Sequence, residues 1–207
     1  MEIEIFPSEF VRLVREHFAD ADIRTIVEIG SLNGADSLYF KERFPHARVV
    51  AIEGLAENFE KYMKQLEGIE CVNATVADHN GETVFHVKNV NGIHSIFDRG
   101  ARYGRERRTV QCSRLDSIFD EPIDMMKIDV EGATYEVLVG LGDLLPQAKA
   151  MHIETEDYPF FDGQRLHDEV AALLEGAGFT MVKKTSVDIH SPTGTIHHQH
   201  DSVWVHV

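Results

Sequence analysis

The sequence predicts an α/β fold in which a doubly wound, mostly parallel sheet of seven strands lies between helices. Apolar runs of strand length alternate along the chain with amphipathic helical segments, which is the order that such a sheet requires. One apolar run, at residues 25–29, leads directly into a glycine-bearing turn and a helix. Two strand-like segments close together near residue 207 predict an antiparallel edge strand. We therefore expect a single domain over residues 1–207.

Residues 1–24 are expected to form a helix that covers the sheet. Ser8 is of a residue type that caps helices, and a helix would follow it over residues 9–18. Val11 and Val14 lie on one face of that helix at helical spacing. This face would pack on the sheet.

The next part of the chain is predicted to form three strands and two helices. Pro45 ends the first of these helices, because proline cannot continue a helical hydrogen-bond pattern. The predicted strands are residues 25–29, 48–53 and 70–77, and the predicted helices are residues 35–44 and 56–66.

A β-hairpin-like insertion is predicted at residues 82–114, between the third and fourth strands. Residues 83–87 and 109–112 are rich in strand-forming types and flank a basic loop. Residues 88–114 contain seven Lys or Arg and two acidic residues, a local charge of +5. Such runs are often mobile and solvated, and the functional alternative is a lid or acceptor-binding loop that faces an anionic substrate. The basic residues are Lys88, Arg99, Arg102, Arg105, Arg107, Arg108 and Arg114.

After the insertion the alternation of strands and helices resumes. Gly176 and Gly178 are expected to end the last helix. Residues 185–201 are polar and rich in histidine and turn residues, so a loop is expected there. The predicted strands are residues 123–129, 150–154, 179–184 and 202–207, and the predicted helices are residues 134–145 and 164–174.

The composition is typical of a soluble enzyme. The chain is 43% hydrophobic and 27% charged, and it has neither a signal peptide nor an apolar run that could span a bilayer, so we expect a cytoplasmic protein that binds no membrane. The net charge of −15 disfavours a nucleic-acid partner. Cys71 and Cys112 have no metal-type spacing and are expected to be small buried residues. No feature of the sequence indicates an oligomeric state.

Carboxylates and glycines at the ends of the first two strands predict a Rossmann-like nucleoside site. Ligands of open α/β sheets bind outside the carboxyl ends of the strands, where glycine lets the backbone approach closely. Glu53 would accept hydrogen bonds from both hydroxyls of a ribose. Gly30 and Gly34 lack the third glycine of a dinucleotide motif, and Glu28 would repel a pyrophosphate but attract an ammonium group. S-adenosylmethionine has an ammonium group and no phosphate. The alternative is a turn that only closes a strand–helix contact.

With these residues the chain resembles class I S-adenosylmethionine-dependent methyltransferases and, within that class, the FkbM family. In one respect the chain departs from the family pattern, which usually has Asn two residues after the first glycine, because Leu32 stands there and Asn33 follows. The resemblance covers residues 25–156 and rests on Val27-Glu-Ile-Gly30, Ala51-Ile-Glu53, Asn73-Ala-Thr-Val-Ala-Asp78, Leu115-Asp-Ser-Ile118 and Lys127-Ile-Asp-Val-Glu-Gly132.

The resemblance implies roles for several strand-end residues. The methionine end of the cofactor would be held by Glu28 and by the turn residues Gly30, Ser31, Asn33 and Gly34. Glu53 would hold the ribose, and Asp78 would bind the adenine amino group with Ala77 beside it.

Methyl transfer to an unactivated hydroxyl calls for a general base or a Lewis-acidic metal. Asp129 and Glu131 follow the fourth strand, and Glu154 ends the fifth, so these carboxylates should meet at one edge of the sheet. Metal-dependent sugar O-methyltransferases carry a similar acidic pair, and Mg²⁺ prefers oxygen ligands. Asp129 and Glu154 are therefore candidate ligands, and Asp129 and Glu131 are candidate catalytic residues. The alternative is that Asp129 orders the cofactor pocket and Glu131 caps a helix.

Histidines provide further candidates. His94 lies in the insertion, where it would be either a catalytic base or an exposed loop residue. His152 has apolar neighbours, which favours a hydrogen-bonded core residue. His197, His198 and His200 would lie exposed in the last loop, with adventitious metal binding as the alternative to plain solvent exposure.

These features together predict an S-adenosylmethionine-dependent O-methyltransferase that acts on a hydroxyl of a small, polar, sugar-containing or anionic molecule. The acceptor class follows from the resemblance alone, and a methyl group accepted by nitrogen is compatible with the same residues. Two other classes stay open: an NAD-dependent oxidoreductase and a nucleoside-binding protein without catalytic activity.

Overall fold

The computed structural model describes residues 5–90, 92–100, 104, 106–190 and 195–206. This part of the chain contains ten strands and five α-helices. The strands are β1 (Thr25–Ile29), β2 (Arg48–Glu53), β3 (Glu70–Asn73), β4 (Thr75–Val76), β5 (Gly81–Val87), β6 (Glu106–Ser113), β7 (Met125–Ile128), β8 (Ala150–Glu156), β9 (Thr180–His190) and β10 (Ile196–Val205). The α-helices are α1 (Pro7–His17), α2 (Ala35–Arg43), α3 (Ala56–Asn58), α4 (Thr134–Gly140) and α5 (His167–Gly176).

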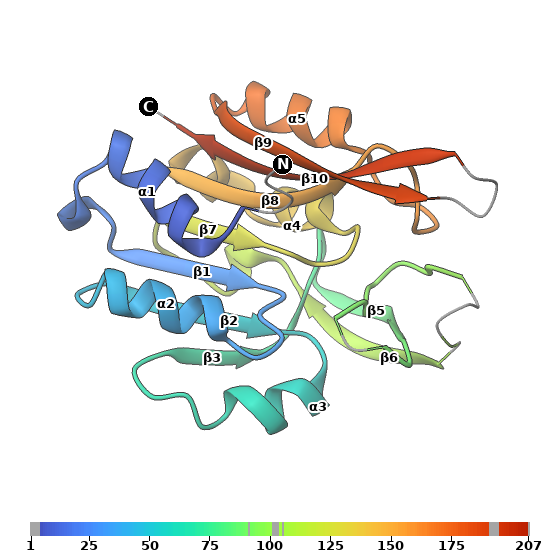
Figure 1. Cartoon of the computed structure of the whole chain (residues 1–207). Coiled ribbons are helices and arrows are strands. Elements are labelled where there is room, and N and C mark those ends of the chain that lie inside the picture. The colour runs from blue at the N-terminus through green and yellow to red at the C-terminus, as the bar shows by residue number, and fades with distance from the viewer. Residues whose placement is uncertain (1–4, 91, 101–103, 105, 191–194, 207) are drawn as a thin grey trace.

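Seven strands form the large sheet in the order β3-β2-β1-β7-β8-β10-β9, as Figure 1 shows. β3, β2, β1, β7 and β8 run parallel, whereas β10 pairs antiparallel with both β8 and β9. This arrangement confirms the predicted fold class. The carboxyl ends of the parallel strands meet at one edge of the sheet, beside the small sheet formed by β4, β6 and β5.

The two faces of the large sheet carry separate apolar clusters. Ile26 of β1 packs with Phe10 of α1 and with α2 on one face. Val27, the next residue, packs with Val137 of α4 and with α5 on the other face. Consecutive strand residues point to opposite faces, so a strand buried on both sides is apolar at every position.

The N-terminal helix covers the sheet as predicted, but Ser8 does not cap it. α1 begins at Pro7, and Phe6 occupies the cap position without a side-chain hydrogen bond. Proline is favoured at the first helical position because its missing N–H has no partner there in any case.

The predicted third strand is broken in two. β3 pairs with β2 up to Asn73, and after Ala74 the chain enters β4, which pairs with β6 of the small sheet. β5 and β6 pair antiparallel over residues 81–87 and 106–112, which fits the hairpin-like insertion expected between the third and fourth strands.

Three predicted helices have other bounds or other geometry. After the single turn of α3 the chain continues as a π-helix over Phe59–Met63. α4 ends at Gly140 and is followed by a 3₁₀-helix over Gly142–Gln147. α5 begins at His167 and includes Gly176, so only Gly178, with φ of 95°, lies beyond its end in the left-handed conformation.

The prediction of a loop at residues 185–201 was wrong for most of that segment. β9 continues to His190 and β10 begins at Ile196, so the histidines of this segment belong to a long hairpin. His200 is buried, and its Nδ1 lies 2.8 Å from the hydroxyl of Ser186. Burial lowers the pKa of His200 to about 4. In the described residues these histidines do not form a group with metal-ligand geometry.

None of the helices in the described part of the chain has the length and apolar character needed to cross a bilayer.

Candidate active site

A cavity of about 290 Å³ lies at the carboxyl ends of the parallel strands, where ligands of open α/β sheets bind. β1, β2 and β8 contribute to it, and so do the residues that directly follow β7. The insertion closes the opposite side through Phe85, His94, Ser95 and Ile96. The large and the small sheet therefore line the same cavity. Figure 1 shows the small sheet beside the carboxyl ends of the parallel strands.

Glu53 lies at the end of β2 and lines this cavity, as a ribose-binding carboxylate should. Its two oxygens accept hydrogen bonds from the backbone N–H groups of Leu32 and Leu55, each at 2.8 Å. Burial raises the pKa of Glu53, and these N–H groups oppose that shift because they stabilise the charged form. The carboxylate is thus fixed in place before any ligand binds.

The residues predicted to contact adenine lie elsewhere. Ala77 and Asp78 do not line the cavity, and Asp78 pairs with the His79 ring at 2.8 Å on the surface. The cavity is lined here by Ala74, Thr75 and Val76. The chain leaves the large sheet after Asn73, so the residues at the strand end come earlier in the sequence than Ala77 and Asp78.

The glycine turn packs closely against the end of β7, and part of it lines the cavity. Gly30 has φ of 83°, and a Cβ at this position would overlap the carbonyl oxygen of Asp129. Gly34, with φ of 73°, precedes α2 in the left-handed conformation. Gly30 and Leu32 line the cavity, whereas Gly34 does not. Ser31 and Asn33 are bonded within the turn and also lie outside the cavity.

Glu28 does not reach the cavity either. Its carboxylate is buried and accepts hydrogen bonds from the Ser37 N–H, at 2.9 Å, and from the Ser37 hydroxyl, in the first turn of α2. Burial raises the pKa of Glu28 to about 7, against the attraction of Lys127. Glu28 therefore ties β1 to the start of α2, where a carboxylate suits the positive end of a helix.

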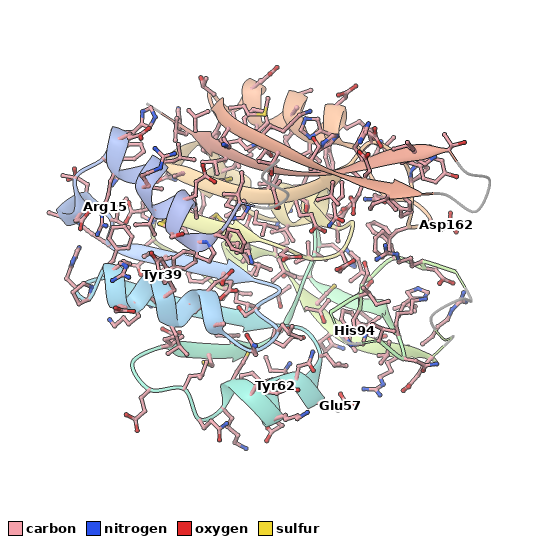
Figure 2. All side chains as sticks on the ribbon, viewed as in Figure 1. Arg15, Tyr39, Glu57, Tyr62, His94 and Asp162 are labelled. Atoms are coloured by element: carbon pink, nitrogen blue, oxygen red, sulfur yellow. The ribbon has the colours of Figure 1, made fainter. Side chains whose placement is uncertain are left out.

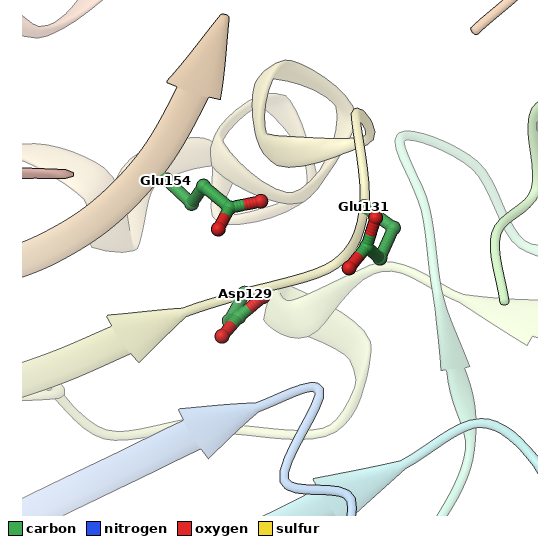
Figure 3. Close-up of side chains that lie close together, drawn as sticks. All are labelled: Asp129, Glu131 and Glu154. Atoms are coloured by element: carbon green, nitrogen blue, oxygen red, sulfur yellow. The ribbon is translucent and has the colours of Figure 1, made fainter. Parts of the chain in front are cut away.

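Three carboxylates gather at the far end of the cavity. Asp129 follows β7, Glu131 lies in the next turn, and Glu154 projects from β8 (Figure 3). One oxygen from each lies within 4.8 Å of the others, and all three side chains are partly buried. The sequence predicted this convergence.

The charge of this acidic cluster, Asp129, Glu131 and Glu154, is only partly compensated. Lys127 Nζ lies 3.6 Å from an Asp129 oxygen, and an Arg99 nitrogen lies 3.1 Å from a Glu131 oxygen. Burial, and then the Asp129 carboxylate, raise the pKa of Glu131 to about 8. The same causes raise the pKa of Glu154 well above its usual range. Such a cluster favours the uptake of a proton or of a cation.

A second cavity of about 140 Å³ shares Asp129 and Glu154 with the first. It lies under the start of α1, and both signs of charge line it, from Lys127 and from Asp36. These two side chains are paired at 2.6 Å. Sequence reasoning did not assign Lys127 or Asp36 a role, because neither stands at a strand end.

His152 is a core residue that also lines this second cavity. It is buried against Phe10, with ring centroids 5.5 Å apart. Neither ring nitrogen makes a hydrogen bond to a described residue, although an Asp201 oxygen lies 3.4 Å from Nε2. The expected hydrogen-bonded state of His152 is therefore not what the structure has.

His94 lines the main cavity. Its Nδ1 accepts a hydrogen bond from the backbone N–H of Lys88 at 3.0 Å. A neutral imidazole with Nδ1 as acceptor carries its proton on Nε2. Burial lowers the pKa of His94, which favours the neutral form. In this tautomer Nε2 carries a proton that it can donate to a ligand in the cavity.

Comparison with known proteins shows the family to which a chain with this site belongs. A family model described as the methyltransferase FkbM domain matches residues 28–181. The chain belongs to the FkbM methyltransferase family. The match begins at Glu28 in β1 and ends in β9, so it includes both cavities' strand ends and the whole insertion. It confirms the resemblance to class I S-adenosylmethionine-dependent methyltransferases.

Two curated relatives share parts of this FkbM chain. The 2-O-methyltransferase NoeI of Sinorhizobium fredii is 24% identical over 160 residues, which cover 67% of this chain and 66% of NoeI. The AMB antimetabolite synthetase AmbE of Pseudomonas aeruginosa is 29% identical over 201 residues, which cover 74% of this chain and 9% of AmbE. The chain therefore spans slightly less than two thirds of NoeI and a small part of AmbE.

Solved structures of methyltransferases have the same fold as the FkbM chain. The N-terminal domain of EvdMO1, solved with S-adenosylhomocysteine bound, has a TM-score of 0.55 at 16% identity, covering 99% of this chain and 83% of that one. Precorrin-6y C5,15-methyltransferase from Geobacter metallireducens has a TM-score of 0.51 at 12% identity, covering 96% of this chain and 87% of that one.

The site of this FkbM methyltransferase thus contains some of the residues predicted from sequence and lacks others. Those that line the main cavity are Gly30, Glu53, His94, Asp129, Glu131 and Glu154. Those that do not are Glu28, Ser31, Asn33, Gly34, Ala77 and Asp78. The binding and catalytic roles of the first group stay predictions. Sequence reasoning missed Asn58 and Phe85, which line the cavity from a helix and from the insertion without any motif to mark them.

Proposed function

We propose that this FkbM methyltransferase transfers a methyl group from S-adenosylmethionine to a hydroxyl of a small, polar, sugar-containing molecule. The observation that carries the proposal is one cavity with a preorganised carboxylate, Glu53, at one end and the acidic cluster at the other. The first end suits a ribose, and the second suits the removal of a hydroxyl proton. The similarity to a 2-O-methyltransferase supports oxygen as the accepting atom.

The cofactor would extend through both cavities. The adenosine would lie against residues 74–76, with its ribose on Glu53. The amino-acid end, which has a carboxylate and an ammonium group, would enter the second cavity, where Lys127 and Asp36 offer the matching charges. A Lys127 pKa raised by the nearby carboxylates keeps that ammonium charged.

In the reaction the acceptor oxygen would bond to the methyl carbon as the methyl carbon–sulfur bond breaks, so that S-adenosylhomocysteine leaves with the electron pair, and the hydroxyl proton would pass to a carboxylate of the acidic cluster. Asp129, next to Lys127, is the proposed base, and Glu131 would orient the hydroxyl. Asp129 and Glu154 are also the proposed ligands of a divalent cation such as Mg²⁺, since that ion prefers oxygen ligands and the oxygens of these two side chains converge near Glu131. A bound cation would make the hydroxyl more acidic.

The acceptor would approach beneath the insertion. The five described basic residues of the insertion each have a carboxylate partner: Lys88 with Asp98, Arg99 with Glu131, Arg107 with Asp98, Arg108 with Glu57 and Arg114 with Asp116. Arg102 and Arg105 lie outside the described residues. These pairs favour a neutral acceptor, because an anionic one would have to displace a carboxylate.

Calorimetry with S-adenosylhomocysteine is the first test, with NADH in parallel. We expect micromolar affinity for S-adenosylhomocysteine, about −8 kcal/mol, and no binding of NADH. Glu53→Ala should weaken binding about tenfold or more, since a buried charged hydrogen bond is lost. Glu60→Ala, an exposed change on the neighbouring π-helix, is the control. Tight NADH binding would contradict the proposal.

A second test locates the transferred carbon. S-adenosylmethionine with a ¹³C-labelled methyl group is incubated with a panel of neutral glycosides, with Mg²⁺ or with EDTA. The carbon chemical shift of the product separates an O-methyl from an N-methyl group. Full turnover in EDTA would remove the cation from the proposal, and full turnover by Asp129→Asn would remove Asp129 as the base.

A further inference from the structure

An aromatic cluster lies at the outer end of the β8–β10 pair, and neither cavity includes it. Tyr158 stacks on the ring of His197, with centroids 3.8 Å apart and planes inclined by 28°. Phe160 meets both rings edge-on, at 5.2 Å from Tyr158 and 6.1 Å from His197. Tyr158 is nevertheless 39% exposed, one of few large side chains with that much exposure. A stacked and partly exposed ring presents a rigid, flat surface to a ligand.

The pairing of β8 with β10 puts this cluster on the same sheet face as the acidic cluster. Asp201 lies opposite Glu154, and Gln199 lies opposite Glu156. Side chains alternate along a strand, so His197 continues the face that carries Glu154. Tyr158 stands four residues beyond Glu154, which corresponds to roughly 13 Å at about 3.3 Å per residue. That distance is longer than one sugar ring.

Side-chain contacts join the acidic cluster to the aromatic one. The Arg99 guanidinium, ion-paired with Glu131, lies 5.9 Å from the centre of the Phe160 ring and 5.0 Å from that of Phe161. Phe160 in turn contacts Tyr158. A ligand cannot reach from one cluster to the other directly along β8, because Glu156 between them is buried and hydrogen-bonded to Gln164. A ligand would therefore pass over Arg99 and Phe160.

The insertion and the segment after β8 form one continuous rim here. The backbone N–H of Asp162 donates to the carbonyl of Asp98 at 2.9 Å, and the Ser95 hydroxyl donates to the carbonyl of Glu131 at 2.7 Å. Figure 2 shows Asp162 and His94 at the same end of the molecule. The guanidinium of Arg99, which lies 5.9 Å from the centre of the Phe160 ring, is already paired with Glu131, so flat, uncharged ligand groups fit the rim best.

We infer that Tyr158, His197 and Phe160 form a second acceptor subsite, which stacks against a neutral sugar ring one unit away from the ring whose hydroxyl lies at the acidic cluster. The inference rests on the proposed function and narrows it. The acceptor is then a neutral glycoside of two or more rings and not a free monosaccharide. Tyr158 determines specificity and takes no part in the chemical step.

The test measures glycoside binding with S-adenosylhomocysteine at saturation, so that it needs no turnover. The probes are neutral disaccharides of glucose, galactose and mannose and the matching methyl monosaccharides, titrated at millimolar concentration by saturation-transfer NMR. The variants are Tyr158→Ala, Tyr158→Phe and the control Tyr62→Ala. Tyr62 is a partly exposed tyrosine with a Lys61 nitrogen 4.5 Å from its ring centre, and it lies beside α3, away from Asp162 (Figure 2).

We expect at least one disaccharide to bind about fivefold more tightly than its monosaccharide, since one stacked ring contributes about 1 kcal/mol. Tyr158→Ala should abolish that preference, whereas Tyr158→Phe and Tyr62→Ala should keep it. Unchanged preference in Tyr158→Ala, or no glycoside binding by protein that binds S-adenosylhomocysteine, would overturn the subsite alone. Absence of S-adenosylhomocysteine binding would overturn the proposed function and this inference together.

Discussion

Glu131 combines a candidate catalytic side chain with an uncommon backbone. Its φ is 53° and the φ of Gly132 is 84°, so two consecutive residues are left-handed. For a residue with a side chain this conformation costs about 1 kcal/mol or more. The insertion stabilises it, because Ser95 bonds to the Glu131 carbonyl and Arg99 pairs with its carboxylate. Backbone strain of this kind persists only where the surroundings fix it, and it gathers at functional sites.

Glu28 should make stability depend on pH near neutrality. Burial raises the pKa of Glu28 to about 7 in the folded chain, from 4.5 for an exposed glutamate. A carboxyl with a raised folded pKa adds stability below its unfolded pKa, and this stability is lost as pH rises through the folded value. The loss for Glu28 is about 3 kcal/mol between about pH 4.5 and pH 7. Glu28→Gln keeps an acceptor for Ser37 and removes this dependence.

The measurement is urea unfolding of both proteins across that pH range. Relative to wild type, Glu28→Gln should gain about 3 kcal/mol in free energy of unfolding as pH rises. Glu60→Gln, at an exposed position, is the control and should show no such trend. A parallel pH dependence in wild type and Glu28→Gln would show that Glu28 ionises normally.

At the scale of elements, two glycines allow the energetic cost of a left-handed backbone to be compared with the cost of a steric overlap. Gly30 and Gly100 have φ of 83° and 81°. A Cβ on Gly30 would overlap the Asp129 carbonyl between β1 and β7, whereas no described atom lies within 4 Å of a Cβ on Gly100. Gly100→Ala should therefore cost about 1 kcal/mol for its conformation alone. Gly30→Ala should cost about 3 kcal/mol or more, because the strand ends must also move apart.

Thermal and urea unfolding of both alanine variants provide the comparison. Equal losses would mean that the β1–β7 contact at Gly30 relaxes freely, and the close approach of the two strand ends would then have no energetic importance.

The sequence predicted the parallel strands well and the irregular elements poorly. β1 and β2 have the predicted bounds because a continuous apolar run between polar residues forms a strand that is buried on both faces. The break at Ala74 depends on a partner, β6, that lies far along the chain. β9 and β10 extend through a histidine-rich segment because cross-strand pairs such as His198 with Asp188 stabilise it, and a single-sequence pattern does not contain such pairs.

The candidate site divides in the same way. Glu53, Asp129 and Glu154 line the cavity because the ends of parallel strands meet at one edge of a sheet, whatever the rest of the fold is. Glu28 lies outside the cavity because its side chain points from β1 to the start of α2, where Ser37 binds its carboxylate. Phe85 was missed because the insertion reaches the cavity only through tertiary contacts.

For the whole molecule, ligand binding should raise the unfolding temperature. A ligand at one hundred times its Kd adds about 2.7 kcal/mol to the stability of the folded state. In a chain of this length about 1 kcal/mol corresponds to 2–4 °C, so we expect S-adenosylhomocysteine to raise Tm by about 5–11 °C. Differential scanning calorimetry measures this shift, with NADH as the control ligand. An equal shift with both ligands would indicate a nonspecific nucleotide effect.

The sides of the main cavity differ in how far their residues belong to the core of the large sheet. Ile29, Ile52 and Val76, on the side assigned to the cofactor, are also core residues, so their replacement disturbs the large sheet. Phe85, Gly92 and residues 94–96 line another side and belong to the small sheet and to the loop that follows it, outside the large sheet. Replacement of residues on the insertion side should therefore disturb the large sheet less than replacement of residues on the first side. We expect such replacements to change the proposed acceptor preference while the proposed cofactor side stays intact.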